Sequence, residues 1–361
     1  MNTFLQTSGT QIIDTSNQQI HLRGFAFGNQ VWETNDVPIN HHSEIDYERL
    51  KNMGANVVRF YMNYKAFESD TPPYKNKKEG WDWLNENIAW AKKHGIYHIL
   101  NLHLPHGRFL SLGDGNAIWD ESIYQDRIAS FWKKIAEKYK NEPQIAGYGL
   151  LNEPSPTASI SQWQNFAQRL TDEIRAIDKN HILFIERAIK IKEALEEDHN
   201  LNFPIVKDNN IAYEFHMFQP YAYTHQLLEW AGIGDVGSYP DAAVSQYTNE
   251  LDGADNSDNT AYKRDKTYLK VVLERFVAWG NKNQVPMYMG EFGTCIPTFK
   301  DNKGGLNWVK DVLEIANENN LNYTYHAYHE DSYGVYSMAE RLPNAESANE
   351  ELINLFMVFL G

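Results

Sequence analysis

Short apolar segments alternate with amphipathic segments along this 361-residue chain. The alternation predicts an α/β fold, a (β/α)8 (TIM) barrel formed by a single domain over residues 1–361. The apolar segments are rich in β-branched and aromatic residues and lack regular polar alternation, which is typical of strands buried on both faces of a parallel sheet. The competing fold, a doubly wound open sheet, usually carries a glycine-rich fingerprint after its first strand, and residues 20–36 contain none.

Eight strands are expected, at residues 20–27, 56–62, 97–103, 146–152, 182–187, 211–216, 286–291 and 322–328. Helical patterns lie between and after them, at residues 44–52, 81–94, 122–140, 161–178, 264–282, 304–319 and 345–360. Gly54 and Gly95 stand where two of these helices should end, because glycine readily adopts the left-handed conformation of a helix C-terminus.

Residues 217–262, after the sixth strand, form a long loop insertion within the domain. Loops of this length in a compact domain are usually functional or disordered. The first half is aromatic and the second half, which includes residues 249–262, is acidic and polar. We expect the first half to line a cleft and the second half to be a solvated flap.

The charge balance excludes several classes of partner. The chain has 33 Lys and Arg against 48 Asp and Glu, a net charge of −15, which argues against nucleic acid and anionic membranes because both bind basic residues. The single cysteine cannot form an internal disulfide or a multi-cysteine zinc site. No apolar run reaches the length of a membrane span, and the first residues show no signal-peptide pattern. We expect a monomer without cofactor or metal, located in the cytoplasm, with secretion left open if a leader has been removed.

Polar side chains gather at the ends of the expected strands. In (β/α)8 barrels the active site lies at the C-terminal ends of the strands. The polar residues at these ends are Asn29, Arg59, His103, His106, Asn152, Glu153, His216, Glu291, His326 and Tyr328. Because barrel closure brings all strand ends to one mouth, we expect these side chains to form one site.

Two of these residues are glutamates placed directly after strands four and seven. Glu153 precedes Pro154, which removes a backbone donor and ends the strand, and Glu291 ends residues 286–291. Two carboxylates facing one bond are the groups that glycoside hydrolysis requires, one holding a proton for the leaving oxygen and the other ionised. We expect Arg59 and nearby histidines to keep one acid charged, and Asn152 to contact a sugar hydroxyl.

Aromatic residues make up 13% of the chain, and those near the strand ends suit the apolar faces of sugars. Trp32, Trp119, Tyr221 and Tyr328 are candidates for such platforms, because a flat ring offers a large apolar face. The tryptophans inside helical patterns are expected to pack between helix and barrel instead; these are Trp81, Trp83, Trp90, Trp132 and Trp163.

These motifs resemble glycoside hydrolase family 5, a family of cellulase-like, retaining (β/α)8-barrel β-glycanases, over nearly the whole chain. The most specific matches are the sequences LNEP at residues 151–154 and GEFG at residues 290–293. Supporting matches are Arg59, His103 and His216 at their strand ends. The run from His216 to Gln226 is similar to one endoglucanase branch of the family.

The resemblance implies roles for these residues. Glu153 would be the acid/base and Glu291 the nucleophile, with Arg59 holding Glu291 ionised. Asn152 would bind the 2-hydroxyl of the reacting sugar. His103, His216 and their neighbours would line the subsite where the bond is cut. The two carboxyl groups should lie about 5–5.5 Å apart, as retention requires. The implied substrate is a β-1,4-glucan or cello-oligosaccharide cleaved endo-wise by double displacement, with β-mannan or another β-glycoside as the alternative.

Two positions depart from the family pattern. The family usually has a tyrosine two residues after the strand-six histidine, where this chain has Phe218, so a hydroxyl near the nucleophile would have to come from Tyr221 or Tyr223. The family usually has a tryptophan at the end of strand eight, where this chain has His326. An imidazole offers less apolar face than an indole and can form hydrogen bonds.

Two further function classes stay open. A carbohydrate-binding barrel with weakened catalysis would keep the cleft and explain the two departures. A metal-dependent hydrolase would use the H-x-x-H pairs at residues 103–106 and 326–329, since histidine is a permissive metal ligand. Barrel metallohydrolases usually open with H-x-H on the first strand, and residues 20–31 contain only His21.

Overall fold

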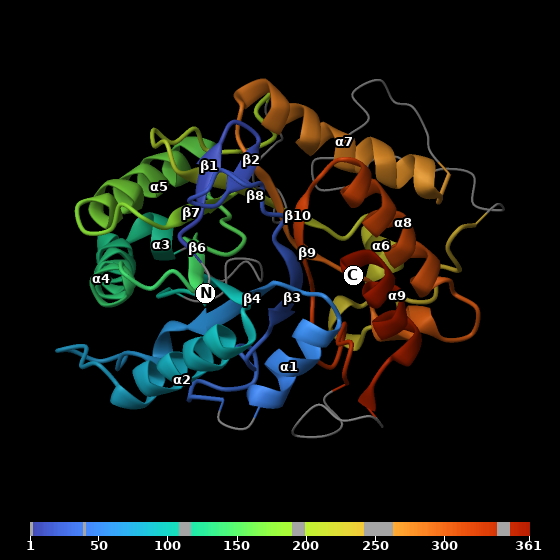
Figure 1. Ribbon diagram of the computed structural model, residues 1–361, viewed down its shortest axis with the longest axis horizontal. Helices are drawn as coiled ribbons and strands as arrows, with labels where there is room; N and C mark the ends of the chain where they lie inside the picture. The colour runs from blue at the N-terminus through green and yellow to red at the C-terminus, as the bar shows by residue number, and fades with distance from the viewer. Residues whose placement is uncertain (1–2, 39–40, 108–116, 190–198, 242–262, 338–346) are drawn as a thin grey trace.

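Eight parallel strands close into a barrel in the computed structural model (Figure 1), which describes residues 3–38, 41–107, 117–189, 199–241, 263–337 and 347–361. The order around the barrel is β10-β3-β4-β5-β6-β7-β8-β9. The strands are β3 (Arg23–Phe27), β4 (Val57–Asn63), β5 (Tyr97–Leu104), β6 (Ile145–Gly149), β7 (Ile182–Glu186), β8 (Ile211–Met217), β9 (Met287–Phe292) and β10 (Asn322–Tyr325). The predicted barrel is confirmed. Strands β6 and β10 each end three residues before the predicted boundary, although Leu150 and His326 still donate backbone hydrogen bonds to neighbouring strands.

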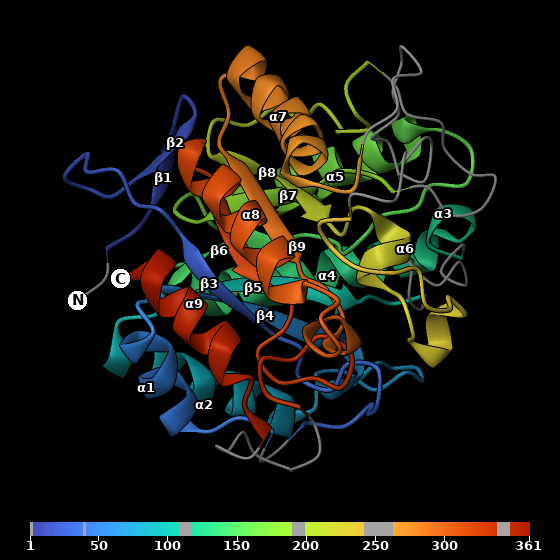
Figure 2. The same cartoon turned by 90° about the vertical axis from the view of Figure 1, so that its right-hand side faces the viewer.

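Helices follow the barrel strands and surround them (Figures 1 and 2). The long helices are α1 (Glu44–Asn52), α2 (Lys78–His94), α4 (Ser122–Tyr139), α5 (Ile160–Arg175), α7 (Lys266–Asn283), α8 (Gly305–Glu318) and α9 (Glu350–Leu360). The short helices are η1 (Tyr64–Ala66), α3 (Ala117–Asp120), α6 (Tyr221–Thr224), η2 (Glu229–Ala231) and η3 (Ile296–Phe299). Gly95 ends α2 with a φ of 70°, and Gly54, with a φ of 87°, follows the end of α1. Both glycines therefore terminate helices as their positions predicted.

The two ends of the barrel differ in what covers them (Figure 2). A hairpin of β1 (Gln6–Ser8) and β2 (Gln11–Ile13) lies at the N-terminal end of the strands, and the short helices α3 and α6 lie at the opposite end. The first half of the predicted loop at residues 217–262 contains α6 and η2, whereas its predicted solvated flap, residues 242–262, lies outside the described residues. The active-site end of the barrel is thus lined by short, irregular elements.

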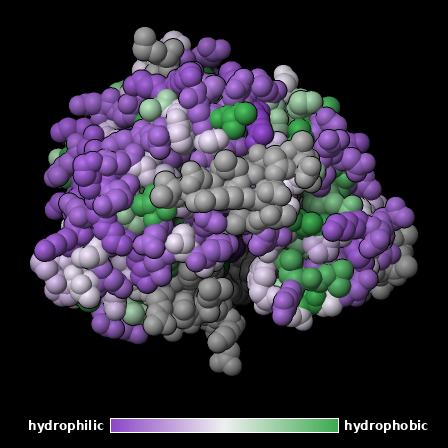
Figure 3. Space-filling model, turned by 90° about the horizontal axis from the view of Figure 1, so that it is seen from below, coloured by the Kyte–Doolittle hydropathy of each residue, from purple (hydrophilic) through white to green (hydrophobic). Residues whose placement is uncertain are grey.

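The surface seen from below is largely hydrophilic, with small and separate hydrophobic patches (Figure 3). This agrees with the net charge of −15. Within the described part of the chain, no helix combines the length and the apolar composition that crossing a membrane requires.

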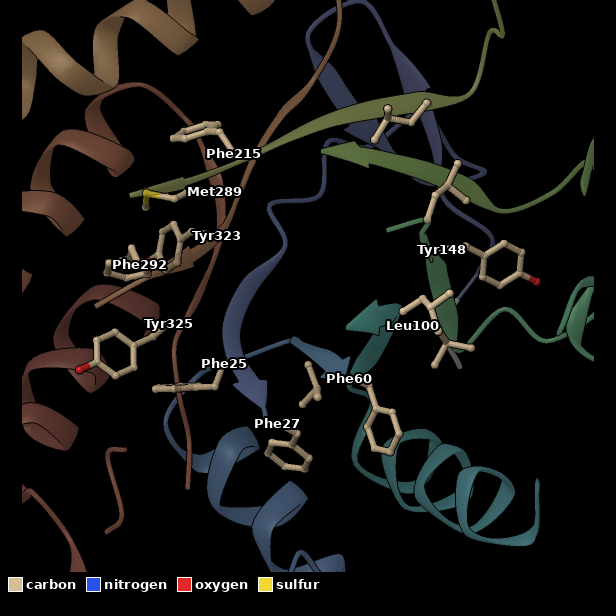
Figure 4. Packing of buried hydrophobic residues seen from close by; sticks show 14 of the residues in the cluster. Phe25, Phe27, Phe60, Leu100, Tyr148, Phe215, Met289, Phe292, Tyr323 and Tyr325 are labelled. Carbon is tan, nitrogen blue, oxygen red and sulfur yellow. The ribbon is translucent and has the colours of Figure 1, made fainter. Parts of the chain in front are cut away.

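The core has two layers because successive side chains of a strand point to opposite faces. Outward-pointing residues pack against the helices (Figure 4): Phe25 contacts Phe356 of α9 at 4.7 Å between ring centroids, and Phe215 stacks on Phe276 of α7 at 4.2 Å. Truncating one such ring to alanine should cost about 3–5 kcal/mol.

A separate apolar cluster fills the barrel interior near its N-terminal end. It joins the N-terminal hairpin to inward-pointing strand residues, namely Leu5, Ile12, Leu22, Val57, Tyr97, Ile99, Ala146, Ile182, Phe184, Ala212 and Tyr288. The interior above this cluster is polar and charged. The same strands therefore fill the barrel with apolar side chains at one end and carry polar and charged side chains at the other.

Candidate active site

Glu291 lies near the end of β9 and is surrounded by groups that favour its charged form. Its Oε1 accepts hydrogen bonds from Arg59 Nη1 at 2.6 Å and from the Tyr61 hydroxyl at 2.7 Å. Burial by itself would raise the pKa of Glu291, but positive charge on the neighbouring imidazoles, His216 foremost, and on Arg59 outweighs burial and lowers the pKa well below its ordinary value. Glu291 is therefore ionised at neutral pH and held in one orientation.

Glu153 stands two residues beyond the LL pair that follows β6, in a strained backbone conformation. Its φ is 44°, in the left-handed region, which costs on the order of 1–3 kcal/mol for a residue other than glycine. Its N–H donates to Glu186 Oε2 at 3.0 Å, which holds the turn. The Glu153 side chain is 20% exposed, against 6% for Glu291. The strained turn thus presents Glu153 to the mouth of the barrel while Glu291 stays buried.

The two carboxylates face each other across the mouth. One oxygen of Glu153, one oxygen of Glu291 and a ring nitrogen of His216 all lie within 4.8 Å of one another. Retaining glycosidases hold their carboxyl groups about 5–5.5 Å apart, whereas inverting enzymes need about 6.5–9.5 Å for an intervening water. The spacing belongs to the shorter class.

Arg59 links the nucleophile position to the rest of the site. It is fully buried on β4, where Nη2 donates to Asn152 Oδ1 at 3.0 Å and lies 2.8 Å from Glu214 Oε1. Because Oδ1 of Asn152 accepts from Arg59, the orientation of the amide presents Nδ2 as a donor. An NH2 group of this kind suits a sugar hydroxyl.

His216 bridges the acid/base position to two buried acids. Its Nδ1 lies 3.0 Å from Glu153 Oε1, and its Nε2 lies 3.4 Å from Glu186 Oε1 and 3.6 Å from Glu214 Oε1. Burial would lower the pKa of His216, but the surrounding carboxylates, Glu186 first, raise it well above its ordinary value. Burial also raises the pKa of Glu186 well above that of a free glutamate. The pKa of Glu186 is thus raised while that of Glu291 is lowered, and acid–base chemistry uses such opposite shifts.

We call these six residues the mouth cluster: Arg59, Glu153, Glu186, Glu214, His216 and Glu291. Aromatic rings form a wall beside it. Tyr61 stacks on His103 at 3.9 Å between centroids, with 14° between the ring planes. Trp32 stands edge-on to His103 at 5.0 Å and to His326 at 5.9 Å, and is 39% exposed. Trp32 therefore offers an accessible ring next to the reacting groups.

Three predicted residues lie away from the mouth cluster in the structure. His106 is fully buried and faces Glu68 Oε1 at 3.3 Å. It lies beyond the end of β5 and three residues after the inward-pointing His103, so strand alternation does not direct it to the interior. The Tyr328 hydroxyl donates to Asp46 at the foot of α1 at 3.0 Å. Trp119 is partly buried and packs on the hydrophobic core. These residues contribute packing and buried hydrogen bonds rather than a sugar platform.

Tyr221 and Asn29 occupy intermediate places. Tyr221 is 39% exposed on α6 and stacks on His225 at 3.8 Å between ring centroids. Its aromatic ring is therefore accessible at the outer edge of the mouth. The Asn29 side chain donates to the Tyr61 carbonyl oxygen at 2.9 Å and supports the strand that carries Arg59. All the helical tryptophans pack within or against the core as predicted.

Three side chains of the site, Tyr61, Glu186 and Glu214, were not predicted from the sequence, and one hydroxyl was expected from other residues. The hydroxyl on the nucleophile comes from Tyr61, not from Tyr221 or Tyr223, and the Tyr223 hydroxyl donates to the Lys303 carbonyl instead. Glu186 and Glu214 were the other omissions. The signal was available, because Tyr61 lies two residues after Arg59 and Glu214 two residues before His216, and such pairs share one face of a strand.

The candidate metal ligands do not assemble as the H-x-x-H pairs suggested. His103 stacks on Tyr61 while His106 faces Glu68, and His326 lies beside Glu291 while His329 stacks on His41. Carboxylates and His216 in the mouth cluster are close enough to share a cation. A proton on His216 would have to leave first, since its raised pKa favours the protonated ring, which has no free lone pair.

A closed parallel barrel with an ionised carboxylate facing a second carboxylate, at the C-terminal ends of strands four and seven, defines a glycoside hydrolase. The family model described as "Cellulase (glycosyl hydrolase family 5)" matches residues 13–332. The chain therefore belongs to glycosyl hydrolase family 5 and is an enzyme of that family, as the resemblance implied.

Relatives and solved structures agree with this assignment. Endoglucanase C of Acetivibrio thermocellus is 23% identical over 320 residues, covering 87% of this chain and 90% of that protein. Cellodextrinase A of Ruminococcus flavefaciens is 20% identical over 283 residues, covering 78% and 77%. Endoglucanase Cel5A from Thermotoga maritima superposes with a TM-score of 0.71 at 20% identity, covering 92% of this chain and 96% of that chain. Cellulose synthase subunit Z of Clostridioides difficile gives 0.70 at 18%, covering 93% and 99%.

Proposed function

We propose that this enzyme hydrolyses β-1,4-linked glucan or cello-oligosaccharides endo-wise, with retention of anomeric configuration. The observation that carries the proposal is the ionised Glu291 held within 4.8 Å of Glu153. The names of its relatives, an endoglucanase and a cellodextrinase, support a β-glucan substrate. Exposed Trp32 and Tyr221 beside the mouth suit the apolar faces of a sugar chain.

Under this proposal each carboxylate has one role. Glu291 attacks the anomeric carbon and forms the glycosyl–enzyme bond while Glu153 gives its proton to the leaving oxygen. Glu153 then removes a proton from water, which attacks the same carbon and releases Glu291. Arg59 and Tyr61 keep Glu291 charged and oriented before attack. His216, 3.0 Å from Glu153, is placed to stabilise Glu153 after it has lost its proton.

The Asn152 amide supports the same reaction. Arg59 donates to its Oδ1, which leaves its NH2 group as a donor for substrate. This group would bind the 2-hydroxyl of the reacting sugar, where hydrogen bonds strengthen in the transition state of glycoside hydrolysis. The result is a contact that stabilises the transition state more than the substrate.

The test is a product profile with three variants. Glu291→Gln should lose activity on every substrate by on the order of 10⁴-fold. Glu153→Gln should lose activity on polysaccharide but keep glycosylation of aryl glycosides whose leaving group needs no proton. Glu137→Gln, an exposed residue of α4, is the matched control and should behave as wild type.

Substrate and stereochemistry are measured in the same assays. β-1,4-glucan, mixed-linkage glucan, β-mannan and short cello-oligosaccharides form the panel, and proton NMR during turnover identifies the first anomer released. We expect β-anomers and internal cleavage of β-1,4-glucan. First release of the α-anomer, or full activity in Glu291→Gln, would overturn the mechanism, and preferred cleavage of mannan would replace the substrate.

A further inference from the structure

Tyr61 joins the nucleophile to the residue at the end of the eighth strand. Its hydroxyl lies 2.7 Å from Glu291 Oε1 and 2.9 Å from His326 Nδ1. Both Tyr61 and His326 are buried, with 0% and 6% of their surfaces exposed. His326 Nδ1 also lies 3.7 Å from Glu291 Oε2, so its ring borders the carboxylate that attacks the sugar.

The proton positions in this chain of contacts follow from the donor inventory. A tyrosine hydroxyl has one proton to donate, and an ionised carboxylate can only accept. Tyr61 therefore donates to Glu291, and its oxygen must accept from His326. The proton of His326 that makes this bond is on Nδ1, which leaves Nε2 as the second polar atom of the ring.

The surroundings of His326 leave Nε2 for a ligand. Besides Tyr61, three aromatic rings pack around the imidazole: Trp32 at 5.9 Å, Phe218 at 6.0 Å and Tyr333 at 5.3 Å between centroids. Carbon atoms of aromatic rings cannot satisfy a ring nitrogen. Among the described residues, no hydrogen bond reaches Nε2. A sugar hydroxyl both donates and accepts, so it can pair with Nε2 in either protonation state of the ring.

We propose that Tyr61 and His326 act as a coupled pair, in which Tyr61 positions Glu291 and His326 Nε2 binds one hydroxyl of the sugar in the subsite where the bond is cut. Tyr61 is then a positioning residue and His326 a specificity-determining residue. The enzyme would then select its sugar through the hydrogen bond of His326 Nε2, and Tyr61 fixes the position of His326 relative to Glu291. This inference rests on the proposed roles of Glu153 and Glu291.

The first experiment tests the positioning half with Tyr61→Phe, which keeps the ring that stacks on His103 and removes the hydroxyl. Loss of a donor to a carboxylate raises its pKa, so the acid limb of kcat/KM should move to higher pH by about one unit, and kcat should fall about 10- to 100-fold. The matched control is Tyr148→Phe, which also removes a buried hydroxyl donating to a carboxylate, that of Asp178 at 2.7 Å. The control should share any loss of Tm and keep the wild-type pH profile. Equal pH profiles for the two variants would overturn the positioning role.

The second experiment tests the specificity half with His326→Asn and His326→Phe. An asparagine amide can replace the Nδ1 donor toward Tyr61 but has no atom at Nε2, whereas phenylalanine removes both. Aryl β-cellobiosides that lack one hydroxyl of the ring under attack, at position 3 or 6, serve as probes. In the wild type one deoxygenation should cost about tenfold or more in kcat/KM, and His326→Asn should abolish that penalty with little change in the acid limb. His326→Phe should change both.

The outcomes separate this inference from the proposed function. If Glu291→Gln retains activity, the roles of the carboxylates fail and the inference with them. If Glu291→Gln is inactive while every deoxygenation penalty survives in His326→Asn, the reaction stands and the hydroxyl contact of His326 is overturned.

Discussion

Two buried charged clusters lie close together at the mouth end of the barrel, and they are built from similar residues with different balances of charge. The mouth cluster places four carboxylates around Arg59 and His216. The second, which we call the Glu68 cluster, places two carboxylates among an arginine, a lysine and a histidine; its members are Glu68, Asp70, His106, Arg127 and Lys134. His103 borders the first cluster and His106 belongs to the second, three residues further along the chain.

The directions of the pKa shifts distinguish a structural charged cluster from a catalytic one. Burial by itself would raise the pKa of Glu68, but hydrogen bonds from His106, Lys134 and Arg127 outweigh it and lower the pKa to about 2. All its acids are thus stabilised as anions. In the mouth cluster the pKa of Glu291 is lowered while that of Glu186 is raised. Perturbed pKa values occur in structural networks as well, so opposite shifts within one cluster are the more specific sign of an acid–base site.

The largest expected effect is on the mouth cluster, from Arg59→Met. Glu291 and Glu214 would lose the guanidinium that contacts both. We expect kcat/KM at neutral pH to fall by on the order of 10²–10³-fold, since one preorganised donor is lost, and the acid limb to move to higher pH. Steady-state kinetics on an aryl β-cellobioside measure both. Arg59→Lys keeps the charge and should lose less, and a wild-type pH profile in Arg59→Met would remove Arg59 from the reaction.

The corresponding change in the Glu68 cluster, Arg127→Met, should affect stability instead. Arg127 donates to Glu68 at 3.0 Å and to Asp70 at 3.1 Å from a position on α4. Removing one partner of a buried pair costs about 3 kcal/mol or more. Urea unfolding should show this loss, while kcat at a temperature where both proteins are folded stays within about twofold. A fall in kcat as large as that of Arg59→Met would erase the distinction between the two clusters.

The pH dependence of stability gives a third comparison through Glu68→Gln. A carboxyl whose pKa is about 2 in the fold and about 4.5 when unfolded stabilises the protein fully above pH 4.5. That contribution is lost as the pH falls through this window toward 2. The Tm difference between wild type and Glu68→Gln should therefore be largest near neutral pH and shrink below pH 4.5. Thermal unfolding followed from pH 7 to pH 3 measures it, and a constant difference would contradict the assigned shift.

The barrel could be predicted from the sequence, and so could the orientation of site residues that lie within strands. Arg59, His103 and His216 lie within strands, and the two-residue alternation places them in the interior. Glu291 does not follow that alternation from Tyr288; the pairing of β8 with β9 shifts register before it, so that His216 pairs with Glu291. The same rule counts against His106, which lies three residues after His103 and faces Glu68 instead.

The remaining site could not be predicted because it depends on contacts between distant strands. Whether Tyr61 reaches Glu291 is decided by the distance across the barrel from β4 to β9, 230 residues apart in sequence. Glu186 and the residue it supports, Glu153, are 33 residues apart in sequence. The sequence shows that Glu186 and Glu214 are acidic residues within apolar strands. It does not show that both are buried near Arg59.

The smallest expected effect is a gain in stability from Glu186→Gln. The raised pKa of Glu186 means that the fold binds a proton more tightly than the unfolded chain does. Its contribution is present below the unfolded pKa of about 4.5 and lost as the pH rises toward its folded pKa. A glutamine keeps the acceptor for the Glu153 N–H and carries no charge. The variant should therefore gain about 2 °C in Tm near pH 8, with a smaller gain near pH 5. It should also lose activity, because the charge that raises the pKa of His216 is gone.

Lower stability of Glu186→Gln than of wild type at pH 8 would contradict this prediction. It would show that the mouth cluster stabilises the anion of Glu186, as the Glu68 cluster stabilises its own acids, and the contrast between the two clusters would fail.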